Sequence, residues 1–183
     1  MPEPEPDPIQ FEYAGKVKGP DDTWKADFVE VEGCFLPALD RERFETDQDL
    51  QENVILASRC AKRFIGLPIS VSHQYAHDPR EAHDPEKHIV VGKIVDAWMK
   101  PDHSMHARFR IDTGTLKGGF AVSGIKKGLF KGLSLAHRNL INTRTNERVQ
   151  IPLELSLCKE GKRPDTWITS CTFMASKNGK EKY

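Results

Sequence analysis

The sequence lacks the features that place a protein outside the cell or in a membrane. Its 183 residues include four cysteines, which are widely spaced and form no C-x-x-C pair, whereas disulfide frameworks are usually denser. No apolar run reaches the roughly 18 residues that a membrane-spanning helix needs, and the first residues lack the basic and apolar regions of a signal peptide. We therefore expect reduced thiols, an intracellular location and no membrane partner.

The sequence also lacks an excess of basic residues. Lys and Arg number 27, as do Asp and Glu, so the formal net charge is zero. Proteins that bind nucleic acid usually carry a basic excess, because phosphate contacts supply most of their affinity. We expect no nucleic-acid partner.

The length suits one folded domain with tails at both ends. The first ten residues alternate proline with acidic residues, and such a segment has few backbone donors and little to bury. We expect a disordered tail over 1–20, a domain over 21–174 and a flexible C-terminal tail over 175–183.

Hydrophobic patterning predicts a mostly β domain with flanking helical structure. Apolar residues at spacings of three and four after Thr46 predict a helix over 46–65. Two Asp-Pro pairs predict a polar loop over 74–88. Alternating or continuous apolar residues predict strands at 26–36, 67–73, 89–98, 105–111, 130–136, 149–158 and 166–173. A mostly antiparallel barrel or sandwich is the expected architecture.

Three polar residues on separate predicted strands have the chemistry of a serine hydrolase, although each taken singly is more often structural. Ser134 shares its strand face with small residues only, which leaves room for a substrate backbone. His73 ends the strand 67–73, and an imidazole can take and return a proton near neutral pH. Glu154 faces away from the apolar side of its strand; it is either a solvated glutamate or the carboxylate that orients a catalytic histidine.

Two further residues follow the strand of Glu154. Lys162 and Arg163 come directly after Gly161. A backbone N–H and a cation at this point could stabilise an oxyanion, or the three residues form an ordinary basic turn.

Four segments, in the same order along the chain, resemble the herpesvirus assemblin proteases. L-P-I-S-V-S-H at 67–73 resembles their strand with the catalytic histidine, and V-G-K-I at 91–94 resembles the strand that follows it. G-L-S-L at 132–135 resembles the segment that holds the nucleophile. S-L-C-K-E-G-K-R-P-D-T at 156–166 resembles their S-[LI]-C-x-x-G-R-R-x-G-T block, the most specific of the four.

The resemblance implies an antiparallel β-barrel of the assemblin and prohead protease type, with Ser134 as nucleophile and His73 as base. It places Lys162 and Arg163 at the oxyanion hole, although a lysine cannot reproduce a guanidinium fork. Assemblins usually carry a second histidine where this chain has Glu154. A Ser-His-Glu set instead resembles the prohead proteases of tailed phages.

The function that this resemblance implies is that of a serine endopeptidase of capsid maturation. Its substrates would be scaffolding or capsid precursor proteins, cleaved inside an immature viral capsid, and no metal or cofactor would be required. Family precedent implies a homodimer or an association with the assembly, although only ten residues follow Phe173, which leaves little room for the family's dimerisation helix.

Three other interpretations stay open. The first is a metal-dependent hydrolase, suggested by the histidines at 73, 77, 83, 88, 103 and 106. The second is an inert capsid or scaffold module of the same fold. The third uses Cys158 as nucleophile. If Glu154 does not orient His73, Asp78 or His137 is the alternative.

Overall fold

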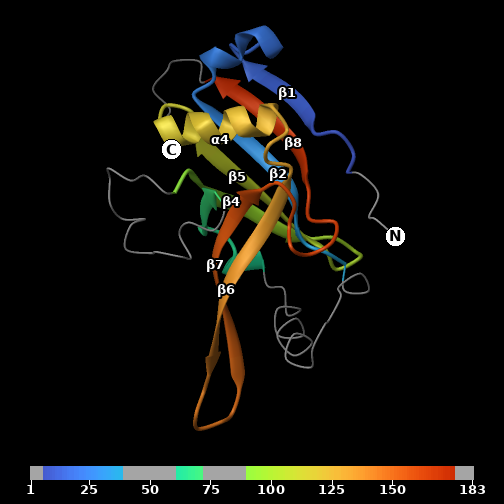
Figure 1. Cartoon of the computed structure of the whole chain (residues 1–183), viewed down its shortest axis with the longest axis vertical. Helices are drawn as coiled ribbons and strands as arrows, with labels where there is room; N and C mark the ends of the chain where they lie inside the picture. The colour runs from blue at the N-terminus through green and yellow to red at the C-terminus, as the bar shows by residue number, and fades with distance from the viewer. Residues whose placement is uncertain (1–5, 39–60, 72–89, 176–183) are drawn as a thin grey trace.

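The computed structural model describes residues 6–38, 61–71 and 90–175, and these residues are mostly β (Figure 1). The helical elements are the 3-10 helices η1 (Pro20–Lys25) and η3 (Ala61–Arg63) and the α-helix α4 (Leu116–Lys126). The strands are β1 (Gln10–Gly15), β2 (Phe28–Leu36), β3 (Pro68–Val71), β4 (Gly92–Met99), β5 (Met105–Asp112), β6 (Gly132–Ile141), β7 (Arg148–Cys158) and β8 (Ile168–Ala175).

The seven predicted strands are confirmed as β2 to β8, with ends shifted by a few residues. The helix predicted over 46–65 falls mostly outside the described residues, and only η3 lies in its last part. The loop predicted over 74–88 and all but the first residue of the C-terminal tail also lie outside them.

The tail predicted over 1–20 is wrong from residue 10 onward, where β1 pairs in parallel with β8. Two aromatic side chains on β1 explain the difference. The ring centroids of Phe11 and Tyr13 lie 6.3 and 6.0 Å from that of Phe173 on β8. The alternation of proline with acidic residues ends before β1, and the aromatic residues that follow contact the neighbouring strand.

The strands form one eight-stranded sheet in the order β1-β8-β2-β5-β4-β3-β7-β6. It is open in strand order and mixed in direction, because β1 pairs with β8 and β3 with β7 in parallel. The other five pairs among the described strands are antiparallel, so the sheet is mostly antiparallel as expected. An isolated bridge between Gly132 and Trp167 joins β6 to the residues ahead of β8. There, the Leu133 N–H donates to the Thr166 carbonyl over 2.9 Å.

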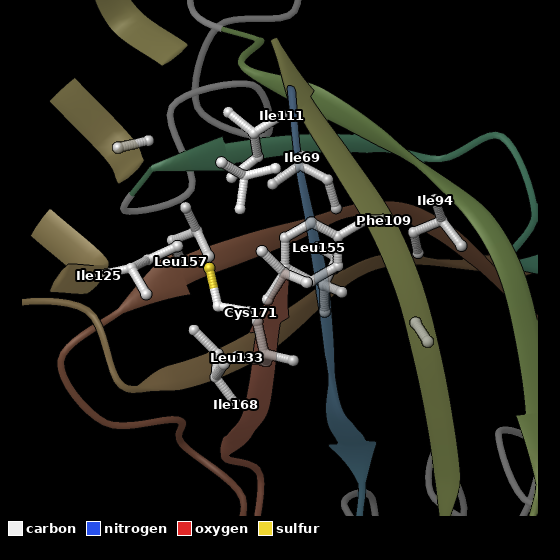
Figure 2. Close-up of a cluster of buried hydrophobic side chains, with 14 of the residues drawn as sticks. Ile69, Ile94, Phe109, Ile111, Ile125, Leu133, Leu155, Leu157, Ile168 and Cys171 are labelled. Atoms are coloured by element: carbon white, nitrogen blue, oxygen red, sulfur yellow. The ribbon is translucent and has the colours of Figure 1, made fainter. Parts of the chain in front are cut away.

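The core lies on one side of these strands, where alternate side chains point inward. Figure 2 shows this cluster, with α4 supplying Ile125 against residues from the sheet. Its labelled members are Ile69, Ile94, Phe109, Ile111, Ile125, Leu133, Leu155, Leu157, Ile168 and Cys171, all fully buried or nearly so.

The helix α4 was not predicted, because its glycines give it weak intrinsic helix propensity. Tertiary packing compensates. The Thr115 hydroxyl caps the helix by accepting from the Gly118 N–H over 3.0 Å. Ala121 and Ile125 are buried against the core. A Cβ at Gly124 would lie 2.5 Å from Cδ2 of Phe130, so only glycine lets this ring pack against the helix.

The opposite side of β2, β4 and β5 carries an ion-pair network. Arg108 donates to Asp96 over 2.9 Å, and Arg110 donates to Glu30 over 3.1 Å. These residues alternate with buried apolar ones in the sequence, which is why that pattern predicted strands with one polar face. Ion pairs at such partly exposed positions each contribute little to stability. Their charged residues favour solvent exposure of this face of the sheet.

No helix within the described residues is long and apolar enough to cross a membrane.

The adjacent glycines of α4 provide a test of its packing. A Cβ at Gly118 would clash with the Asp112 carbonyl oxygen and would lie 2.7 Å from the Thr115 hydroxyl, whereas at Gly119 the nearest atom would be 3.8 Å away. Gly118→Ala should therefore lower the free energy of unfolding by about 2 kcal/mol through overpacking. Gly119→Ala should raise it by about 0.5–1 kcal/mol through helix propensity. Urea unfolding measures both, and equal effects would contradict this account.

Candidate functional site

Three serines lie in a row across the neighbouring strands β3, β7 and β6. Ser70 is the register partner of Ser156, and Ser156 is the register partner of Ser134. Partners in register share a face of the sheet. Because Leu133 and Leu155 point into the core, the serine row lies on the opposite face. Ser134, the predicted nucleophile, is half-buried.

Glu154 lies on the same face as this row, and it is fully buried. The alternative of a solvated glutamate is therefore wrong. Its Oε2 atom accepts a hydrogen bond of 2.7 Å from the Ser70 hydroxyl, which is also fully buried. A buried carboxylate needs such donors, because its desolvation would otherwise cost several kcal/mol. Residues 84 positions apart in the chain thus meet.

A β-bulge in β7 lies next to Glu154, between it and the turn of the β6–β7 hairpin. Ala136 pairs with Glu154, but His137 pairs with Pro152, so Leu153 is the extra residue. Beyond the bulge the faces of β7 are exchanged relative to the predicted alternation. Ile151, expected on the apolar face, is exposed, as are Leu140 and Ile141 on the paired strand.

The loop after β7 packs against the beginning of β6, one residue ahead of Ser134. A Cβ at Gly161 would lie 2.5 Å from the Leu133 carbonyl oxygen, so only glycine permits this close approach. The Thr166 hydroxyl donates to the Arg163 carbonyl over 2.8 Å and holds the turn. Lys162 is exposed and Arg163 is half-buried.

His73 and Asp78 lie outside the described residues. Of the five predicted site residues, the structure therefore brings Ser134 and Glu154 to one face of paired strands. It brings the loop of Lys162 and Arg163 to the adjoining end of β6. His137, the alternative orienting residue, lies on β6 at the bulge.

A second polar cluster, on β5 and the turn before it, was not predicted as a unit. The Ser104 hydroxyl lies 2.5 Å from Oδ1 of Asp102 and 2.9 Å from Nε2 of His106. The His106 ring stacks on Trp98 with a centroid separation of 6.2 Å. The spacing D-x-S-x-H on alternate positions was the signal that could have indicated it.

This cluster has the residue types of a hydrolytic triad in a different order. The carboxylate contacts the serine, whereas in a triad it contacts the histidine. Hydrogen bonds from Ser104 hold the pKa of Asp102 below its usual value, so Asp102 is ionised and only accepts. Ser104 therefore donates its proton to Asp102 and accepts one from His106. His106 is then the Nε2–H tautomer and cannot deprotonate Ser104.

The thiol alternative is disfavoured by burial. Desolvation raises the pKa of Cys158 to about 11, so little thiolate exists at neutral pH. The metal alternative rests mainly on histidines outside the described residues. Within the described ranges, no group of three or more His, Cys, Asp or Glu side chains is arranged to hold a metal ion.

Comparison with known proteins adds no family assignment. No protein-family model matches the chain, and no curated protein matches it.

The Ser70–Glu154 hydrogen bond should be measurable as stability. Ser70→Ala removes a buried donor to a carboxylate, so the free energy of unfolding should fall by about 2 kcal/mol. Ser170→Ala, at a half-buried position on β8, is the matched control and should change it by less than about 0.5 kcal/mol. Urea unfolding at neutral pH compares the two, and a neutral Ser70→Ala would show that the bond contributes no net stability.

His106 should make stability depend on pH. Burial first, and then the Lys100 cation, lower its pKa from 6.5 to about 4. The unfolded chain binds this proton below about pH 6.5, whereas the folded chain does not until about pH 4. Stability from this group is thus lost as pH falls, by about 2 kcal/mol between pH 7 and pH 5.

His106→Gln should flatten the fall in unfolding free energy between pH 7 and pH 5, measured by urea unfolding. His103→Asn, at an exposed position with φ of 68°, is the control, because asparagine tolerates that conformation. A His106→Gln profile parallel to that of the unsubstituted protein would refute the assignment.

Proposed function

We propose that this chain is a serine endopeptidase of capsid maturation, with Ser134 as nucleophile, His73 as base and Glu154 as the carboxylate that orients it. The observation that carries the proposal is the buried Glu154 carboxylate, fixed by Ser70, on the same strand face as Ser134. Glutamate is almost never fully buried unless it is paired, because the desolvation cost is high. The buried Glu154 is therefore the residue on this face that most needs an explanation.

The spacing suits a bridging imidazole. Ser134 pairs with Ser156, and Glu154 is two residues along β7 from that partner. Diagonal neighbours on one face of a sheet lie roughly 7 Å apart. That separation is too long for direct contact and about right for one imidazole ring hydrogen-bonded on both sides. His73 lies two residues beyond the end of β3, the strand that borders β7 on its other side.

The reaction is acyl transfer in two steps. His73 takes the Ser134 proton as the hydroxyl oxygen attacks a substrate carbonyl, and then gives it to the leaving amine. Glu154 stabilises the imidazolium. Water, deprotonated by the same histidine, releases the acyl group.

The oxyanion would be held by the loop after β7. Gly161 in this loop packs on the Leu133 carbonyl, one residue ahead of Ser134. This close approach supports a role for the adjoining Lys162 backbone and Arg163 side chain. The assemblin block has an arginine at the position of Lys162. If the oxyanion is bound by the backbone N–H of that residue, a lysine serves equally well.

A barrel of the assemblin and prohead protease type is the proposed architecture. The bridge between Gly132 and Trp167 supports it, because it links β6 to the residues preceding β8. Scaffolding or capsid precursor proteins as substrates, an immature viral capsid as location, and a homodimeric or assembly-associated state rest on the sequence resemblance.

A fluorophosphonate probe tests the nucleophile. We expect labelling at Ser134, its loss in Ser134→Ala and in His73→Ala, and a rate reduced at least tenfold in Glu154→Gln. Intact mass measurement and peptide mapping identify the labelled residue. The folded state of each variant is checked by urea unfolding.

Ser104→Ala is the matched control, since the Ser104 hydroxyl lies 2.9 Å from Nε2 of His106. It should label like the unsubstituted protein. Labelling lost in Ser104→Ala but kept in Ser134→Ala would overturn the proposal. Absence of labelling in every form, including the assembled state, would favour the inert capsid module.

A further inference from the structure

A polar hollow of about 700 Å³ lies apart from the serine row. Its walls come from the N-terminal segment, the end of β2, the turn between β4 and β5, and the residues from Asp165 to Thr172. This volume is in the range of pockets that bind small ligands or a few residues of a peptide.

The charge in this hollow is mainly negative. Among the described residues that line it, Lys100 is the one lysine or arginine, against five carboxylates, those of Asp7, Glu12, Glu32, Asp102 and Asp165. Several of them have partners of their own, such as Arg108 for Glu32 at 3.9 Å. Such a concave surface with one sign of charge concentrates ligands of the opposite sign.

A buried histidine supplies an independent sign of a ligand. His106 lines the hollow with about nine-tenths of its surface buried, and its Nε2–H is committed to Ser104. Its Nδ1 atom is then a neutral acceptor, and the described residues offer it no hydrogen-bond partner. In the described part of the chain, Arg108 Nε is the one fully buried side-chain nitrogen or oxygen without a partner. The Nδ1 atom of His106 is therefore not sealed off from solvent, and His106 lines the hollow.

The cluster behind this histidine orients it for such a ligand. The Asp102 carboxylate polarises the Ser104 hydroxyl, which in turn accepts from the imidazole. This chain strengthens Nδ1 as an acceptor, and stacking on Trp98 fixes the plane of the ring. Trp167 also lines the hollow, and indole is the side chain whose ring binds cations best.

We propose that this hollow binds a cationic hydrogen-bond donor, a guanidinium or ammonium group, with His106 Nδ1 and the surrounding carboxylates as acceptors. The cation is carried either by a basic segment of a polypeptide or by a small molecule. The site is separate from the serine row, so its occupancy does not depend on peptidase activity.

The probe is N-acetyl-arginine methylamide, added to the full chain labelled with ¹⁵N at histidine. Binding should shift the Nδ1 resonance of His106, whereas the isosteric neutral citrulline amide should not. Tri-arginine binding at least tenfold more tightly than the single amide identifies a polypeptide source, and equal affinity identifies a small cation. A shift with citrulline equal to that with arginine, or no shift with either, overturns the proposal.

Charge variants test the same site without relying on loss of folding. Lys100→Gln removes the opposing cation, so the affinity for the arginine amide should rise about threefold. Glu32→Gln should lower it about fivefold, and Glu147→Gln, at an exposed position in the hairpin turn, should leave it unchanged. Affinity that is unchanged or lowered in Lys100→Gln contradicts the assignment.

Discussion

The register that locks β3, β7 and β6 together is the constraint on which the candidate site depends. Because side chains alternate with a period of two, a shift of one residue would move Leu133 and Leu155 out of the core and Glu154 into it. Burial of the leucines therefore also positions the serines and the carboxylate. The cost of burying Glu154 is offset by the fold as a whole, since its hydrogen-bond partner Ser70 arrives from a distant strand.

The two polar faces of this sheet deal with charge in different ways. On β2, β4 and β5, carboxylates such as Glu30 lie beside arginines and remain partly exposed. On β3 and β7, Glu154 is buried and bonded to a neutral hydroxyl. The two carboxylates therefore differ in burial and in the chemistry of the donor, a guanidinium for Glu30 and a hydroxyl for Glu154. The proposed chemistry is assigned to the face of Glu154 because a fully buried carboxylate beside hydroxyl groups is found there.

The sequence was informative wherever a single strand carried the signal. Alternation predicted β2 and β5 because each buries one face and exposes the other. It also placed Ser134 and Glu154 away from the leucines. It failed where distant segments decide the outcome. Glu154 is buried in contact with Ser70, which lies on another strand. β1 pairs with β8, and its Phe11 ring contacts that of Phe173. Local propensity similarly missed α4, whose glycines suit the close approach of a neighbouring ring and strand.

The hairpin of β6 and β7 extends well past its pairing with β3, which ends at Leu155 (Figure 1). The bulge at Leu153 separates this arm from the part of the hairpin that carries Ser134. Residues can therefore be gained or lost in pairs between the bulge and the turn without altering which side chains face each other nearer the core. The length of the arm is free to diverge between related chains while the serine and the carboxylate keep their places.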